Sequence, residues 1–264
     1  MSSPALSVIV ITKNEATQIQ DCLRSVAFAD ELIVVDAGST DTTRELAAAL
    51  GAQVVSAPDW PGFGAQKNRA LALARGRWVL SLDADERVGA ELATQIRAAV
   101  ASSASTPVAY ELNRLSSFCG QWMRHGDWYP DRVRRLFRRE AGRFSDDLVH
   151  ERLLVDGPVG RLTGELYHHT MRDLEDALDK LNRYTSGRAT DKLRAGARGG
   201  LGTALGHAVW AFLRGFLLRR GFLDGRLGFV LAVYVAEGTY YRYLKMHWPT
   251  GVPAPELPVG RVVD

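Results

Sequence analysis

The first ninety residues alternate apolar, β-branched runs with stretches of helical periodicity, and this alternation most constrains the fold. Strands are predicted at residues 6–11, 31–35, 52–56 and 78–82. Helices are predicted between them, at residues 16–26, 41–50 and 66–75. The strand runs lack an alternating polar face, as expected of strands buried on both sides of a parallel sheet. The βαβαβαβ order therefore predicts a doubly wound α/β sheet.

Polar residues directly follow three of these predicted strands. Thr12 and Glu15 follow the first strand, Asp36 follows the second, and Asp83 and Asp85 follow the fourth. Open α/β sheets bind their ligands outside the carboxyl ends of parallel strands. We therefore expect these side chains to line one site.

The segment LSLDADE places Asp83 and Asp85 one residue apart directly after a buried strand. In an extended segment, residues two apart point to the same side. Two carboxylates so close oppose folding unless a positive charge lies between them. Mg2+ prefers carboxylate oxygens and keeps positions open for substrate phosphates, so a cation bridging to a diphosphate is expected. The alternative is that Asp83 caps a turn and Asp85 is solvated.

Two further motifs point to an anionic ligand. Asp36 in VVDAGSTD can accept hydrogen bonds from a base or ribose, although an Asx-turn or helix cap is the alternative and fits Asp41 better. Lys67 in AQKNRAL lies near a predicted helix start, where the helix dipole favours anions. Its alternative is an exposed helical lysine. No glycine-rich turn follows the first strand, which argues against a dinucleotide fingerprint, a P-loop and a nucleotidyltransferase.

The second half of the chain is less regular and then becomes helical and basic. Residues 173–192 are predicted to form a helix. Residues 183–226 contain nine Lys or Arg but only two acidic residues. A broadly apolar helix at about residues 205–218, followed by Arg219 and Arg220, suits an anionic lipid interface. Packing on the catalytic domain or in a dimer is the alternative. No run reaches the roughly 20 uninterrupted apolar residues of a spanning helix.

The composition and the N-terminal segment limit where the protein is expected to be located and which partners it is expected to bind. The net charge of +3 is too small for bulk nucleic-acid binding. Two cysteines imply no disulfide framework, which suits a reducing cytosol. The N-terminus lacks the basic region and the long apolar run of a signal peptide, so a cytoplasmic protein is expected.

The motifs ITKNE, VVDAGSTD, AQKNRAL and LSLDADE, in this order, resemble the family 2 glycosyltransferases. RLFRR, LVHE, HHTMRDLEDALDKLNRYT and GFLDGRLGF extend the resemblance to lipopolysaccharide core β-1,4-glucosyltransferases of the WaaE/KdtX type. The resemblance implies an α/β GT-A fold, a mixed sheet flanked by helices, with a helical C-terminal appendage. The implied domains are a catalytic domain at 1–170, with donor and acceptor halves meeting near residue 100, a helical membrane-associating or dimerising region at 171–248, and a proline-rich tail at 249–264.

The resemblance also implies roles for individual residues around a nucleotide-sugar donor. Thr12 and Glu15 would line the nucleoside pocket, and Asp36 would contact the base or ribose. Lys67 would lie near the donor, and Asp83 would touch ribose or metal-bound water.

A divalent metal, Mg2+ or Mn2+, is implied as the cofactor. Asp85 would ligate it, and His168, a better match than His169, would complete the metal site. The alternative for His168 is a packing role at a helix start.

An inverting transfer needs a base that removes the proton of the acceptor hydroxyl. Glu151 in LVHE is the expected base, with His150 available to orient it. Asp146 and Asp147 compete for this role, and a structural salt bridge is the alternative for Glu151. Six arginines fall within residues 132–143. Among them Arg135 is expected to hold a donor or acceptor phosphate, because guanidinium matches phosphate oxygens.

Together these features predict a metal-dependent inverting glycosyltransferase that moves a hexose, with glucose from UDP-glucose as the expected donor. The expected acceptor is a lipopolysaccharide core or another lipid-linked glycan at the inner face of the cytoplasmic membrane. A polyprenyl-phosphate or capsule acceptor, and a nucleotide-sugar-binding protein without turnover, remain alternatives. A homo-oligomer is left open.

Overall fold

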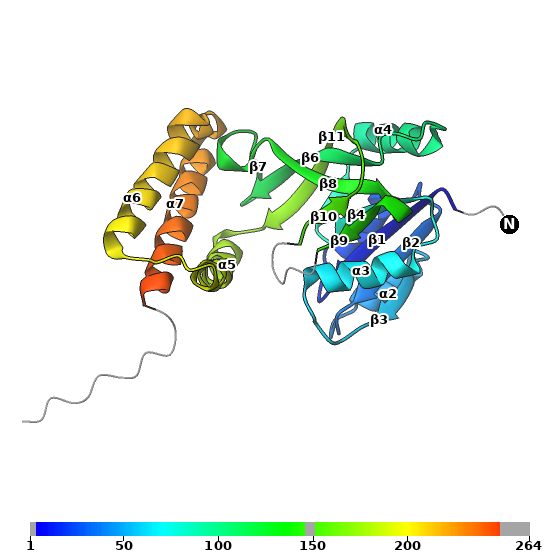
Figure 1. The fold of residues 1–264 in the computed structure, drawn as a ribbon, viewed down its shortest axis with the longest axis horizontal. Coiled ribbons are helices and arrows are strands. Elements are labelled where there is room, and N and C mark those ends of the chain that lie inside the picture. The colour runs from blue at the N-terminus through cyan, green and yellow to red at the C-terminus, as the bar shows by residue number, and fades with distance from the viewer. Residues whose placement is uncertain (1–3, 146–150, 249–264) are drawn as a thin grey trace, which may run out of the picture. The chain divides into compact units, whose positions relative to one another are not determined.

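The computed structural model describes residues 4–145 and 151–248. The chain divides into two compact units, residues 1–173 and 174–264, each of which is described by itself (Figure 1). Asp146, Asp147, His150 and the tail at 249–264 lie outside the described residues.

The first unit is built on a nine-stranded mixed sheet in the order β3-β2-β1-β4-β8-β6-β11-β5, with β7 paired to β6. Its parallel part consists of β1 (Leu6–Thr12), β2 (Glu31–Asp36), β3 (Gln53–Ser56) and β4 (Trp78–Asp83). These are the four strands that the apolar runs predict. The doubly wound arrangement therefore holds for this half of the sheet.

The other half of the sheet mixes strand directions. It contains β5 (Glu86–Val88), β6 (Ala109–Phe118), β7 (Gln121–Trp122), β8 (Asp131–Arg138) and β11 (Val159–Met171). Strand β8 is antiparallel to both β4 and β6, β11 is parallel to β6, and β5 is antiparallel to β11. Two short strands, β9 (Gly142–Phe144) and β10 (Leu153–Val155), form a separate antiparallel pair.

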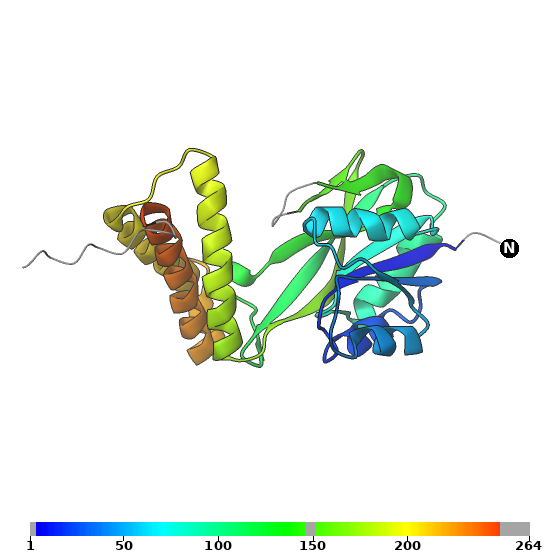
Figure 2. The ribbon, with the colours of Figure 1, turned by 90° about the horizontal axis from the view of Figure 1, so that it is seen from below.

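Helices cover both faces of the parallel strands, which explains why the strand runs carry no polar face. Val8 and Val10 of β1 pack into a core shared with α1 (Ile19–Ser25), α2 (Thr43–Ala49) and α4 (Ala90–Ala101). Ile9 and Ile11 point the other way, into a core shared with α3 (Phe63–Leu73). Figure 2 shows α3 on the opposite side of β1 from α1 and α2. Short 3-10 turns lie at Gly126–Trp128 and Arg139–Ala141.

The second unit is helical. It contains α5 (Leu174–Arg194), α6 (Leu201–Leu213), a π-helical turn (Arg214–Leu218), a 3-10 turn (Gly221–Asp224) and α7 (Gly225–His247). Stacking of His207 on Tyr243, with ring centroids 4.6 Å apart, joins α6 to α7. The ammonium group of Lys245 donates to Asn182 Oδ1 at 2.7 Å and so ties α7 to α5.

One stretch of the described chain, Leu201–Leu218, is long and apolar enough to cross a membrane when judged by length and composition alone. Only 17% of this stretch is buried inside the structure.

Candidate active site

The carboxyl ends of β1, β2 and β4 meet at one edge of the sheet. Thr12, the last residue of β1, is in register with Asp36, the last residue of β2. Ile11 is in register with Asp83, at the end of β4. The parallel register therefore brings the predicted donor residues Thr12, Asp36 and Asp83 side by side.

Lys67 lies between two of the predicted carboxylates. Its ammonium nitrogen is 2.9 Å from Asp83 Oδ1 and 2.7 Å from Glu151 Oε1. Only 2% of the Lys67 side chain is exposed, so it is not a solvated helical lysine. The α3 helix carries this side chain to the sheet edge, where it links two residues that are far apart in sequence.

Arg135 completes the network from β8. One nitrogen of its guanidinium group, Nη2, contacts both Asp83 Oδ2 and Glu86 Oε1. Burial alone would raise the pKa of the Asp83 carboxyl, but the charges of Arg135 and Lys67 outweigh burial and hold this pKa well below its usual range. Asp83 is therefore an ionised carboxylate clamped between two cations.

Asp85 faces His168 across the neighbouring turn. His168 Nε2 lies 3.3 Å from Asp85 Oδ2, and Ser116 Oγ lies 3.0 Å from His168 Nδ1. His169 approaches Asp85 differently, through a backbone N–H that donates to the Asp85 carbonyl at 2.9 Å. The His169 ring instead packs edge-on against Trp122, with centroids 4.9 Å apart. Burial and the charge of Arg87 lower the pKa of His169.

The Asp85–His168 pair fits a divalent cation. Neighbouring ligands on an octahedral ion with bonds of about 2.1 Å lie roughly 3 Å apart, close to the observed separation. Ser116 supplies the kind of second contact that orients a ligating imidazole. Within residues 4–145 and 151–248, no group of three or more His, Cys, Asp or Glu side chains is placed to hold a metal ion. A bound ion would therefore take its other ligands from water and from the substrate.

Asp36 and Asp41 both shape the loop after β2. Asp36 is fully buried, and its carboxylate accepts hydrogen bonds from the backbone N–H groups of Gly38, at 3.1 Å, and Ser39, at 2.9 Å. Asp41 accepts similar bonds from the N–H of Thr43, at 3.0 Å, and of Ala16. The Asx-turn interpretation therefore describes Asp36 as well as Asp41. Any contact of Asp36 with a nucleoside would come in addition to this turn.

The segment after β1 presents one polar atom with no partner. Thr12 Oγ1 is buried and makes no hydrogen bond in the structure. The backbone N–H of Glu15 donates to Thr43 Oγ1 at 2.8 Å, which fastens this loop to the start of α2. Thr12 Oγ1 therefore lies unpaired beneath the surface at the carboxyl edge, and the Glu15 loop is held in place beside it.

Glu86 is a site residue that the motif analysis missed. It is the first residue of β5, its side chain is fully buried, and it contacts Arg135 and, from β6, Arg114. The signal in the sequence was the third acidic residue of DADE, since a carboxylate there must be paired if it is buried.

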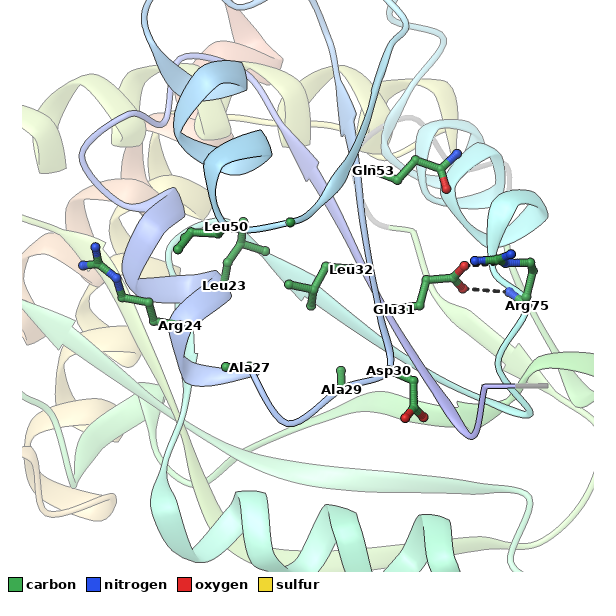
Figure 3. Close-up of a pocket in the computed structure, with 11 residues that line it drawn as sticks. Leu23, Arg24, Ala27, Ala29, Asp30, Glu31, Leu32, Leu50, Gln53 and Arg75 are labelled. Atoms are coloured by element: carbon green, nitrogen blue, oxygen red, sulfur yellow. Dashed lines mark hydrogen bonds and ion pairs between the residues drawn. The ribbon is translucent and has the colours of Figure 1, made fainter. Parts of the chain in front are cut away.

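A separate pocket lies at the other end of the parallel strands (Figure 3). Asp30 and Glu31 line it where β2 begins, whereas Asp36 ends the same strand at the carboxyl edge. Figure 3 shows Glu31 paired with Arg75, with 2.7 Å between Glu31 Oε1 and Arg75 Nε. This pocket does not include any predicted site residue.

Residues 7–142 match the family described as Glycosyl transferase family 2. The chain belongs to this family. An uncharacterized glycosyltransferase, RP128, of Rickettsia prowazekii (strain Madrid E) is 31% identical over 91% of this chain and 86% of its own length. The lipopolysaccharide core biosynthesis glycosyltransferase LpsC of Rhizobium meliloti (strain 1021) is 28% identical over 90% of this chain and 93% of its own length.

Two solved structures also align with the chain. S. aureus TarS 1–349 aligns with a TM-score of 0.47 and 18% identity over 92% of this chain and 90% of that one. Glucosyl-3-phosphoglycerate synthase from Mycobacterium tuberculosis, in complex with Mg2+ and UDP, aligns with a TM-score of 0.36 and 30% identity over 41% and 43% of the two chains.

The family match and the two sequence relatives confirm the predicted family and enzyme class. The protein is a family 2 glycosyltransferase with the GT-A arrangement, a mixed sheet flanked by helices, and a helical C-terminal part.

Proposed function

We propose that this glycosyltransferase is metal-dependent and inverting, and that it transfers a hexose from a UDP-sugar, with glucose as the expected sugar. The observation that carries the proposal is the convergence of two clusters at one sheet edge. Lys67 joins Asp83 to Glu151, with contacts of 2.9 and 2.7 Å, and the Asp85–His168 pair lies one turn away.

Glu151 is the proposed base. A base must lie where it can reach the proton of the acceptor hydroxyl, and the contact with Lys67, at 2.7 Å, holds the Glu151 carboxyl group at the sheet edge. In the transfer, Glu151 takes the proton of the acceptor hydroxyl while that oxygen forms a bond to the anomeric carbon. The bond from the anomeric carbon to the diphosphate breaks on the opposite side, so the configuration at this carbon inverts.

Asp85 and His168 are the proposed holders of Mg2+ or Mn2+. Such an ion, when bound, neutralises the charge that develops on the leaving diphosphate. Thr12, Glu15 and Asp36 form the proposed nucleoside side of the site. Lys67 and Arg135 are buried against carboxylates. We therefore propose that they act on the donor indirectly, by orienting Asp83 and keeping it ionised.

The proposed acceptor is a lipopolysaccharide core or another lipid-linked glycan. The name of LpsC, which aligns over 90% of this chain, supports this choice. A polyprenyl-phosphate or capsule intermediate is the competing acceptor.

The proposed location is the cytoplasmic face of an anionic membrane, reached through the helical region after residue 170. Several large apolar side chains of α6 and of the π-helical turn after it are exposed, namely Leu205, Val209, Trp210, Leu213, Leu217 and Leu218. Arg219 and Arg220 follow directly. Apolar side chains beside basic ones suit a helix lying in a lipid interface.

The test is UDP release from a panel of UDP-sugars, with and without Mn2+ or Mg2+, in the presence of deacylated core oligosaccharide. Metal-dependent release from one donor that rises with the acceptor, and that Asp85→Ala and Glu151→Ala abolish, supports the proposal. UDP binding without turnover for any donor would favour a binding protein. Wild-type rates in both variants would refute the site.

A further inference from the structure

Glu86 is a buried carboxylate directly after the Asp83–Ala84–Asp85 turn, and none of the proposed catalytic steps uses it. Its side chain is fully buried, in contrast to those of Asp83 and Asp85, which are partly exposed. A buried charge is costly unless it is paired and hydrogen-bonded. Its contacts therefore reveal what it does.

One oxygen of Glu86 closes the turn. Glu86 Oε2 accepts a hydrogen bond from the backbone N–H of Asp83 at 3.0 Å. The same turn is held on its other side by the bond from the His169 N–H to the Asp85 carbonyl. In addition, Glu86 and His168 are register partners in the antiparallel pairing of β5 with β11. The Glu86 side chain thus fixes the path of the turn, and strand pairing places that turn beside His168.

The other oxygen of Glu86 holds the arginines. Glu86 Oε1 lies 2.7 Å from Arg135 Nη2 and 3.4 Å from Arg114 Nη1. Arg135 Nε is buried without a hydrogen-bond partner, and Nη2 is the nitrogen of this guanidinium that contacts Asp83 and Glu86. The orientation of Arg135, and with it the clamp on Asp83, depends on Glu86.

We infer that Glu86 is a positioning residue that presents Asp83 to the donor and Asp85 to a divalent cation. The inference rests on the proposed function of the Asp83–Asp85 site. Arg135 contacts two carboxylates, Asp83 and Glu86. Without the negative charge of Glu86, Asp83 would be the carboxylate that remains on Arg135, and we expect Asp83 and its turn to shift toward the guanidinium group.

The test is a titration of the full chain with Mn2+ in the presence of UDP. The paramagnetic resonance signal of free Mn2+ reports how much of the ion is bound. In Glu86→Gln the amide oxygen can still accept the Asp83 N–H, but the charge is lost. We expect Mn2+ binding to weaken about tenfold or more, as for other residues that support metal ligands. The Mn2+ concentration for half-maximal UDP release should rise by the same factor, with a smaller change in kcat at saturating Mn2+.

Glu165→Gln is the matched control, because Glu165 pairs with the exposed Arg124 at 2.6 Å on the same sheet. It should bind Mn2+ as the wild type does. Absence of Mn2+ binding to the wild type with UDP would overturn the proposed function itself. Normal wild-type binding together with equal binding by a folded Glu86→Gln would overturn only the role of Glu86. If Glu86→Gln does not fold, Glu86→Asp, which keeps the charge but shortens its reach, decides by the same tenfold criterion.

Discussion

At the residue scale, the site is a cluster of oppositely charged side chains in which two buried cations pair with carboxylates. Lys67 is buried and has two carboxylate partners, Asp83 and Glu151, while Arg135 supplies a second cation to Asp83. Removing one partner from such a group leaves an uncompensated buried charge, which costs far more than the loss of a surface pair. The same contacts that orient the site are therefore also sources of stability.

Lys67→Met should destabilise the protein by about 3–5 kcal/mol, because two carboxylates lose their shared cation. It should also lower kcat by roughly 100-fold, because Glu151 loses the group that holds it in place. Urea unfolding and UDP release measure the two effects. Arg69→Met, two residues along α3 and paired with the exposed Asp59, is the control and should change little. Equal behaviour of the two variants would contradict the assignment.

Asp83 should make stability depend on acid pH. Burial opposes its ionisation, but Arg135 and Lys67 dominate and lower its native pKa. A depressed native pKa contributes stability that is complete above the unfolded value of about 3.9 and is lost as pH falls through the native value. Unfolding free energies between about pH 5 and pH 2 should therefore fall more steeply for wild type than for Asp83→Asn. Parallel curves would show that Asp83 does not contribute.

At the scale of elements, close backbone approach decides where the site residues lie. Gly64 lies in the first turn of α3, and a Cβ built there would lie 1.8 Å from the Ser145 carbonyl oxygen and 3.4 Å from Glu151 Cβ. A backbone carbonyl cannot move aside as the tip of a side chain can. Only glycine therefore lets α3 approach the segment that carries Glu151, which places Lys67 within reach of it.

Gly64→Ala should separate Lys67 from Glu151 and reduce UDP release by about tenfold or more, as expected for a small misplacement of a reacting group. The control is Gly187→Ala on α5, where a Cβ meets nothing within 4 Å. That change should stabilise the helix by roughly 0.5–1 kcal/mol and leave activity unchanged. Thermal melting and initial rates measure both variants, and full activity in Gly64→Ala would show that the close approach is not needed.

At the scale of the whole molecule, the two units differ in the surface that they expose. The first unit buries its apolar strands under helices on both faces. The second unit leaves Val209 and Trp210 of α6 more than half exposed, at 58% and 52%. Contiguous exposed apolar side chains mark surfaces that bind proteins or membranes.

Replacing Trp210 and Leu217 together by serine should reduce binding to vesicles containing anionic lipid, because apolar area and basic charge act together at the interface. Stability should change by no more than about 0.5 kcal/mol per substitution, since both side chains are exposed. Vesicle co-sedimentation is the measurement. Leu154→Ser, at an exposed apolar position of β10, should sediment like the wild type. A double variant that still binds vesicles as the wild type does would favour a protein interface. So would a wild-type dimer, detected by light scattering, that the double variant no longer forms.

The sequence by itself predicted the family, the four parallel strands and the polar residues at their ends, because burial on two faces leaves a local, uninterrupted apolar run. The family resemblance implied a mixed sheet, but no local pattern located the strands of its second half, where β6 and β11 pair in parallel although about forty residues separate them. Nor did it show that Lys67 lies buried between Asp83 and Glu151, or that Glu86 supports the turn. These contacts join residues up to 84 positions apart. They arise only when the folded sheet brings distant charges together, so no local pattern encodes them.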